Sequence, residues 1–196
     1  MSLDLVLGPM WAGKSSFIIG KIRRYRAIGW EVLVVANPLD DRYGSHMISS
    51  HDKEQVSALS ISNLDILFEN TAYQQARLLV IEEAQFFQGL YQFVKLAVER
   101  DGKHVVCVGL DGDANRQPFG EILSLIPLCD NVEKIKSLCA ECGDGTPALF
   151  SYRFTPSLTQ IQVGAEASYR PLCRKHYLEK SDQVFPRKEE MGPTTE

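Results

Sequence analysis

Eight consecutive residues near the start of the chain have the types and spacing of a phosphate-binding loop. The backbone N–H groups of such a loop turn toward phosphate oxygens, and the helix that follows adds positive potential. Its lysine reaches the β- and γ-phosphates of ATP, and its last hydroxyl ligates Mg²⁺. The alternative is a glycine-containing turn whose lysine merely faces solvent. The pattern G-x-x-x-x-G-K-[ST] is matched without a mismatch by Gly8, Pro9, Met10, Trp11, Ala12, Gly13, Lys14 and Ser15.

Two adjacent carboxylates follow a short apolar run at residues 78–81. Glu82 and Glu83 stand where a phosphate-loop protein places the acid on its Mg²⁺ side. Ligands and catalytic groups collect at the carboxyl ends of parallel strands, and consecutive side chains leaving a strand point in opposite directions. One acid can therefore face the metal while its neighbour faces an acceptor hydroxyl. The alternative is an ordinary acidic turn.

Two pairs of soft ligands lie in the C-terminal third of the chain. Cys139-x-x-Cys142 and Cys173-x-x-His176 form a Cys₃His set, which suits a closed, tetrahedral, structural Zn²⁺ site. The pairs are separated by residues 143–172, a gap longer than that of a usual zinc ribbon, so the excess must leave the site and return. Residues 148–154 and 159–163 could be the two arms of that excursion. Free buried cysteines with a surface histidine remain the alternative.

The surrounding pattern predicts the elements that position these groups. Short runs that are apolar on both faces predict buried strands, and they alternate with segments of helical spacing. This is typical of an α/β fold, a mostly parallel sheet with flanking helices. The expected strands are residues 3–7, 32–36, 78–81 and 105–108. The expected helices are residues 14–28, which Gly29 can stop, and a segment marked by Leu90, Phe93, Val94, Ala97 and Val98.

Near Ser137 the sequence changes to cysteine pairs, glycines and short alternating runs, and this change predicts a domain boundary. Residues 1–137 would form a P-loop ATP-binding α/β domain, and residues 138–180 a small zinc-binding domain carrying a loop. Residues 181–196 are polar with two prolines, and we expect them to be a disordered tail.

Composition excludes several classes of partner. The 196 residues are 44% hydrophobic and carry a net charge of −4, which argues against strong non-specific binding to nucleic acid. The one dense basic cluster, in the first expected helix, is interpreted as a solvated face. Gly8-Pro9 interrupts the first apolar stretch, so we expect neither a secretory signal nor a membrane span. Five cysteines in an apparently cytoplasmic chain fit metal ligands and buried thiols better than disulfides.

Taken in order, these and other motifs resemble those of the thymidine kinases of the cellular and poxviral type (type II). The likeness runs from about residue 5 to residue 177. It covers the phosphate loop and a D-x-R-Y motif, a His-Asp pair, a D-E-[GA]-Q-F-F motif and an L-D-G…P-F-G segment. After the phosphate loop, the matching residues are Asp40-Asp41-Arg42-Tyr43, His51-Asp52, Glu82-Glu83-Ala84-Gln85-Phe86-Phe87, Leu110-Asp111-Gly112 and Pro118-Phe119-Gly120.

The resemblance implies a role for each matching position. Glu83 falls on the catalytic base, Glu82 on the Mg²⁺-side acid beside Ser15, and Arg42 on an arginine that acts with Lys14 near the transferring phosphate. Segment 161–169 resembles a lasso loop that covers the nucleoside and meets the pyrimidine mainly through backbone groups. The residues implied around the nucleoside are Met10, Phe86, Leu110, Phe119, Ile161, Gln162, Val163, Gly164 and Tyr169.

The resemblance also implies the reaction and its partners. The expected activity is transfer of the γ-phosphoryl group of ATP, with Mg²⁺, to the 5′-hydroxyl of thymidine, with deoxyuridine as a further acceptor. A homotetramer inhibited by the end product dTTP is implied as well. The sequence departs from the family at three positions: Glu82 replaces an aspartate, His176 a cysteine, and Ala114 a phenylalanine near the base. The last departure puts nucleoside selectivity in question.

Two other classes share part of this pattern. A P-loop ATPase that uses a zinc ribbon to hold nucleic acid or a protein partner would have the same loop, Mg²⁺ and zinc. The acidic composition and the lack of a basic stripe near the cysteines count against it. A non-catalytic nucleotide-binding protein is the second alternative, and Glu83 beside the metal-side acid counts against that one.

Overall fold

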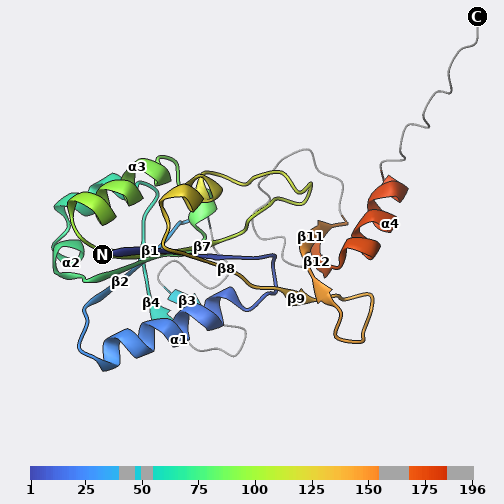
Figure 1. Cartoon of the computed structure of the whole chain (residues 1–196), viewed down its shortest axis with the longest axis horizontal. Helices are drawn as coiled ribbons and strands as arrows, with labels where there is room; N and C mark the ends of the chain where they lie inside the picture. Colours follow the sequence, from blue (N-terminus) through green and yellow to red (C-terminus); the bar gives the residue numbers. More distant parts are fainter. Residues whose placement is uncertain (40–46, 50–54, 155–167, 185–196) are drawn as a thin grey trace, which may run out of the picture.

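The computed structural model describes residues 1–39, 47–49, 55–154 and 168–184 (Figure 1). Several expected site residues lie outside this part of the chain: Arg42, Tyr43, His51, Asp52, Ile161, Gln162, Val163 and Gly164.

A six-stranded sheet forms the centre of the fold, with the order β5-β2-β6-β7-β1-β8. All five strand pairs in it are parallel. The predicted mostly parallel α/β sheet is therefore confirmed. Its strands are β1 (Ser2–Leu7), β2 (Val32–Ala36), β5 (Leu59–Ser60), β6 (Leu78–Ile81), β7 (His104–Gly109) and β8 (Asn131–Lys134).

Strands β2 and β6 are apolar along their whole length because both of their faces are covered. In β6, Leu79 and Ile81 belong to one buried cluster, whereas Leu78 and Val80 belong to the other. Side chains alternate between the faces of a strand, so a strand in the middle layer must be apolar at every position. This explains why unbroken runs, rather than alternating ones, marked the strands in the sequence.

Helices cover both faces of the sheet (Figure 1). On one face α1 (Lys14–Ala27) buries Ile18, Ile19 and Ile22. The other face is covered by α3 (Leu90–Lys95) and the 3₁₀ helix η4 (Ile122–Leu128). A π-helical turn, η3 (Leu96–Arg100), continues α3, so both predicted helices are confirmed. The short helices η1 (Leu64–Glu69) and α2 (Thr71–Gln75) complete this layer.

Beyond the carboxyl ends of the parallel strands lies a smaller unit, drawn in orange and red in Figure 1. It contains two antiparallel pairs, β9 with β10 and β11 with β12, and its own buried cluster. The first expected arm matches β11, and its partner is β12, which the sequence did not predict. The second expected arm lies outside the described residues. The bounds are β9 (Ser137–Leu138), β10 (Pro147–Ala148), β11 (Phe150–Arg153), β12 (Tyr169–Leu172) and α4 (Arg174–Val184).

Two further observations concern the rest of the chain. Helix α4 extends to Val184, so residues 181–184, expected in the tail, are helical. A small hairpin of β3 (Met47–Ser49) and β4 (Gln55–Ser57) was not predicted. Among the helices in the described ranges, none combines the length and apolar character needed to cross a membrane.

Candidate active site and zinc site

The phosphate loop connects β1 to α1, as its sequence predicts. Trp11 and Gly13 both have left-handed backbone conformations, with φ of 65° and 79°, and these turn the loop back on itself. Lys14 is only 7% exposed, and its ammonium donates to the carbonyl oxygens of Gly8 at 3.2 Å and Pro9 at 2.9 Å. The lysine ammonium therefore lies against the first two residues of the loop, and the backbone N–H groups of the loop are expected to bind phosphate oxygens.

Two buried serines of the smaller unit form hydrogen bonds with the backbone of this loop. Ser151 Oγ, on β11, accepts from the Met10 N–H at 2.9 Å. Ser137 Oγ, on β9, donates to the Trp11 carbonyl oxygen at 2.9 Å. Both serines are almost fully buried. The unit that carries the cysteine cluster is thus attached directly to the loop expected to bind ATP, a link that no sequence pattern indicated.

Ser15 and Glu82 meet at the carboxyl edge of the sheet. The Ser15 hydroxyl donates to Glu82 Oε1 at 2.9 Å, and Glu82 is 3% exposed. Hydroxyl and carboxylate oxygens are the ligands that Mg²⁺ prefers. The contact brings together two side chains 67 positions apart that were assigned to the same metal on sequence grounds. The pair therefore fits a Mg²⁺ ion carried with ATP.

Glu83 leaves the strand in a different direction from Glu82. Its backbone is left-handed, with φ of 46° and ψ of 46°, which is uncommon for a residue other than glycine. The side chain is buried, and its Oε2 accepts from Gln85 Nε2 at 2.5 Å. Two adjacent carboxylates thus have different partners, the serine of the phosphate loop for one and a glutamine amide for the other. This supports separate tasks for Glu82 and Glu83.

The residues expected near the nucleoside are partly gathered in the described structure. Phe86 and Phe119 meet edge to face, with ring centroids 5.5 Å apart. Leu110 is linked to the same region because its N–H donates to Gln85 Oε1 at 3.1 Å. Met10 lies in the phosphate loop. Tyr169 is the first residue of β12, opposite Arg153 in the antiparallel register.

The four expected zinc ligands converge. All four ligand atoms lie within 4.8 Å of one another. His176 Nδ1 lies 3.5 Å from the sulfurs of Cys139 and Cys173 and 3.3 Å from that of Cys142. The sulfurs of Cys142 and Cys173 are 3.9 Å apart. A tetrahedral Zn²⁺ with its usual bond lengths separates two sulfurs by about 3.8 Å, and a sulfur from a nitrogen by about 3.5 Å. The donor set therefore fits zinc in both identity and spacing.

Neighbouring groups prepare Cys139 for metal binding. Burial opposes ionisation of this thiol, but N–H groups of Cys173 and Glu141, together with His176, lower its pKa to about 6. The Cys173 N–H donates to the sulfur at 3.2 Å. The thiolate is the form that binds metal, so a donor aimed at the sulfur supports its role as a ligand.

Comparison with known proteins decides the family. A family model described as thymidine kinase matches residues 1–177. The chain belongs to the thymidine kinase family. Members of the family are ATP-dependent nucleoside kinases. A thymidine kinase from Oryza sativa subsp. japonica is 34% identical over 181 residues, which are 90% of this chain and 66% of that protein.

Other thymidine kinases show a similar degree of identity. Thymidine kinase a of Arabidopsis thaliana is 33% identical over 90% of this chain and 75% of its own length. The thymidine kinase of Vaccinia virus (strain Western Reserve) is 34% identical over 90% of this chain and 97% of its own length. The segment matched by the family model, residues 1–177, contains the phosphate loop, both carboxylates and the cysteine cluster.

Sequence reasoning gave no role to three polar residues of the candidate site: Gln85, which stands in a quoted motif, and Ser137 and Ser151. Each is buried, and each has a side-chain hydrogen bond to a group assigned to ATP or to catalysis. A signal existed for Gln85, since it is the one amide in a run that is otherwise acidic or apolar. No such signal marks the serines, because their partners are backbone groups more than 100 positions away.

Proposed function

We propose that this chain phosphorylates thymidine at its 5′-hydroxyl, giving dTMP and ADP, with Glu83 as the general base. The supporting observation is the pair of buried carboxylates after β6. Glu82 is bonded to the phosphate-loop Ser15, and the neighbouring Glu83 is turned away from it by its left-handed backbone. A metal-side acid next to a general base suits phosphoryl transfer to an alcohol.

In the proposed reaction the O–H bond of the 5′-hydroxyl breaks and its proton moves to the Glu83 carboxylate. The oxygen forms a bond to the γ-phosphorus in line with the departing ADP oxygen. Lys14 and Arg42 are proposed to neutralise the negative charge on the transferring phosphoryl group. Such electrostatic stabilisation is usually a larger catalytic effect than proton transfer. Ser15 and Glu82 would hold Mg²⁺. When bound, this ion neutralises charge on the β- and γ-phosphates.

The remaining assignments concern the nucleoside and the assembly. Met10, Phe86, Leu110, Phe119 and Tyr169, with the lasso segment 161–164, are proposed to surround thymidine. Deoxyuridine is proposed as a second acceptor. A homotetramer and inhibition by dTTP rest on the family resemblance. Light scattering tests the first, and initial rates with added dTTP test the second. A cytoplasmic location is proposed because none of the five cysteines forms a disulfide and three of them belong to the expected metal-ligand set.

The test of the base assignment uses two matched variants. Glu83→Gln removes the proton acceptor and keeps the side-chain volume, so turnover should fall about 10²- to 10⁴-fold while ATP still binds. Glu82→Gln should instead weaken Mg²⁺ binding, so the Mg²⁺ concentration that gives the half-maximal rate should rise, as read from rates over a range of Mg²⁺ concentrations. Near-normal turnover in Glu83→Gln would exclude it as the base and leave Glu82 as the next candidate.

A second measurement separates the kinase from an ATPase. ADP formation from labelled ATP should depend on thymidine and should be unaffected by added nucleic acid. If hydrolysis without nucleoside rose on addition of nucleic acid, the proposed function would be wrong, whichever residue acts as the base.

A further inference from the structure

Gln85 is a buried amide whose two ends are both bonded to groups of the candidate site. It lies on the short turn η2 (Ala84–Phe86) and is 3% exposed. Its Nε2 donates to Glu83 Oε2 at 2.5 Å, and its Oε1 accepts from the Leu110 N–H at 3.1 Å. A backbone N–H can only donate and an ionised carboxylate can only accept, so one orientation of the amide satisfies both partners.

The backbone at two glycines approaches Gln85 closely. A Cβ added at Gly109, the last residue of β7, would lie 2.3 Å from Gln85 Oε1. A Cβ at Gly120, next to Phe119, would lie 2.1 Å from the Gln85 carbonyl oxygen. Real Cβ atoms do not approach other atoms this closely, so the glycines at both positions permit the fit. Gln85 therefore sits in a slot between the end of β7 and the segment after Phe119.

Glu83 has a conformation that needs such support. Its left-handed backbone costs free energy in a residue that has a Cβ, and conformations of this kind persist where surrounding structure holds them. The Gln85 amide joins the Glu83 carboxylate to the backbone of Leu110, the residue that follows β7, and β7 pairs with β6 in the sheet. The amide thereby fixes the position of the Glu83 carboxylate relative to the Leu110 backbone.

We propose that Gln85 is the positioning residue for Glu83: it holds the carboxylate in the orientation that accepts the 5′-hydroxyl proton. The proposal rests on the proposed function, in which Glu83 is the base. Leu110 is also assigned to the nucleoside site. The same amide therefore fixes the position of the general base, Glu83, relative to one wall of that site. A displacement of about 1 Å of a catalytic group can lower a rate on the order of 10²-fold.

The test compares two substitutions of Gln85 with a distant control. Gln85→Met keeps the length and removes both hydrogen bonds. Gln85→Glu keeps the shape and the acceptor for Leu110 but puts a second carboxylate against Glu83. Lys103→Met is the control, because Lys103 is buried and bonded to three backbone carbonyls at the other end of the sheet. All three variants are measured as full-length proteins for zinc content, thermal stability, ATP affinity and steady-state kinetics.

Both Gln85 variants should lower kcat for thymidine phosphorylation on the order of 10- to 100-fold and change the KM for ATP less than about twofold. Lys103→Met should lower the melting temperature without this loss of kcat. In the Glu83→Gln background, Gln85→Met should have little further effect, since a base that is absent cannot be misplaced.

The outcomes separate the two proposals. If Glu83→Gln keeps its turnover, the base assignment fails whatever Gln85 does. If Glu83→Gln is inactive but Gln85→Met and Gln85→Glu both turn over normally, Gln85 has no positioning role. A loss of kcat of equal size in the presence and absence of Glu83 would also overturn the proposal, because it would show that Gln85 acts independently. Gln85→Glu gives the result if Gln85→Met does not fold.

Discussion

The hydroxyl of Tyr177 donates a 2.6 Å hydrogen bond to the carbonyl oxygen of Ala114. Tyr177 lies on α4, directly after the expected zinc ligand His176, and Ala114 lies in the segment between Leu110 and Phe119. The Arg116 guanidinium covers the Tyr177 ring at 4.7 Å and fastens the same segment a second time. The unit that carries the expected zinc ligands and the proposed nucleoside wall are therefore joined by a short hydrogen bond beside a cation–π contact.

Tyr177→Phe should weaken nucleoside binding more than ATP binding. The ring and its contact with Arg116 remain, and one hydrogen bond of about 0.5–1.5 kcal/mol is lost. We expect the KM for thymidine to rise roughly three- to tenfold, with the KM for ATP nearly unchanged.

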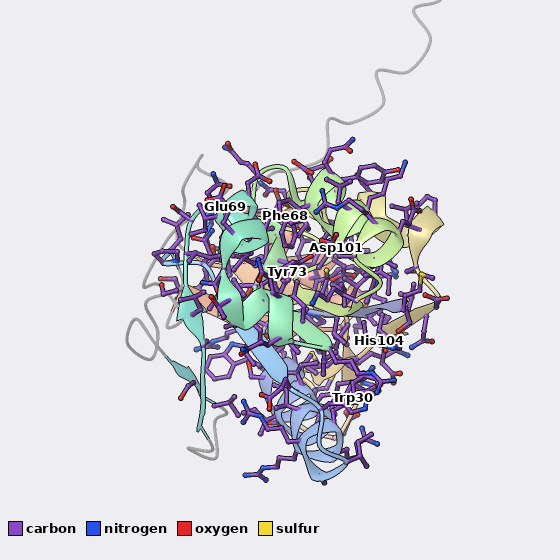
Figure 2. The ribbon with its side chains drawn as sticks, turned by 90° about the vertical axis from the view of Figure 1, so that its left-hand side faces the viewer. Trp30, Phe68, Glu69, Tyr73, Asp101 and His104 are labelled. Carbon is purple, nitrogen blue, oxygen red and sulfur yellow. The ribbon has the colours of Figure 1, made fainter. Side chains whose placement is uncertain are left out.

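A matched control exists at the other end of the sheet. The Tyr73 hydroxyl donates to Asp101 at 2.7 Å, and Figure 2 shows both residues on the face that looks away from α4. Tyr73→Phe should lower the melting temperature and leave both KM values as they are. Equal effects of the two substitutions on the KM for thymidine would contradict this interpretation of the Ala114 contact.

Purified protein should contain one tightly held Zn²⁺ per chain. Structural zinc contributes roughly 10–16 kcal/mol of binding free energy in small peptides, so its removal should unfold the smaller unit. Because Ser137 and Ser151 connect that unit to the phosphate loop, chelation should weaken ATP binding as well as thymidine binding. Metal analysis and ATP titration before and after chelation measure both effects.

Cysteine substitutions give the control for zinc. Cys142→Ser should lower the zinc content and the ATP affinity together. Cys129→Ser should keep both, since its sulfur lies outside the cluster and donates to the Ile126 carbonyl oxygen. Protein prepared without chelator and free of zinc would refute the assignment.

Ala114→Phe should change nucleoside selectivity. Ala114 is half-buried, and family relatives are expected to carry phenylalanine there, so we expect a roomier pocket in this chain. An aromatic contact is worth about 0.5–1.5 kcal/mol beyond its buried area, or roughly tenfold in affinity at most. Thymidine should remain a substrate, and acceptors with extra bulk should lose kcat/KM relative to thymidine in the variant. Unchanged kcat/KM ratios across a panel of analogues would show that the position does not line the pocket.

Asp101→Asn should destabilise the protein more at neutral than at acidic pH. The Asp101 carboxylate accepts from Arg100 Nε at 2.6 Å and Nη2 at 2.9 Å as well as from Tyr73. The hydrogen bond from Arg100, reinforced by Tyr73, holds the pKa of Asp101 below its usual value. A carboxyl whose folded pKa is lowered stabilises the fold above its unfolded pKa of about 3.9, and the effect disappears as pH falls through the folded pKa.

The pH experiment compares melting temperatures of the wild type and Asp101→Asn. A partly exposed ion pair contributes about 0.2–1 kcal/mol, so the difference at pH 7 should be roughly 1–4 °C. It should begin to shrink as pH falls below the unfolded pKa of about 3.9 and continue to shrink through the lower folded pKa of Asp101. A difference that stayed constant over this range would mean that the charge on Asp101 contributes nothing to stability.

The sequence by itself determined the parts of this protein that depend on neighbours along the chain. The phosphate loop is eight consecutive residues, and its function follows from their order. The strands follow from unbroken apolar runs, and the helices follow from helical spacing of apolar residues. The zinc ligands come as two local pairs, and pairing one with the other needs only the preference of zinc for four ligands. Strand β12 escaped prediction because Pro171 lies within it, and proline is unusual in a strand.

Only the tertiary structure decided which distant segments meet. Ser15 reaches Glu82 across 67 positions, Gln85 reaches Leu110 across 25, and Tyr177 reaches Ala114 across 63. The left-handed turn at Glu83 is likewise invisible in its own residue type, since a glutamate seldom adopts that conformation. Such contacts follow from how strands and helices pack, and a hydrogen bond between two polar residues leaves no periodic trace in either segment. The chemistry of the site could therefore be predicted from short local motifs, whereas its geometry depends on how segments far apart in the chain pack together.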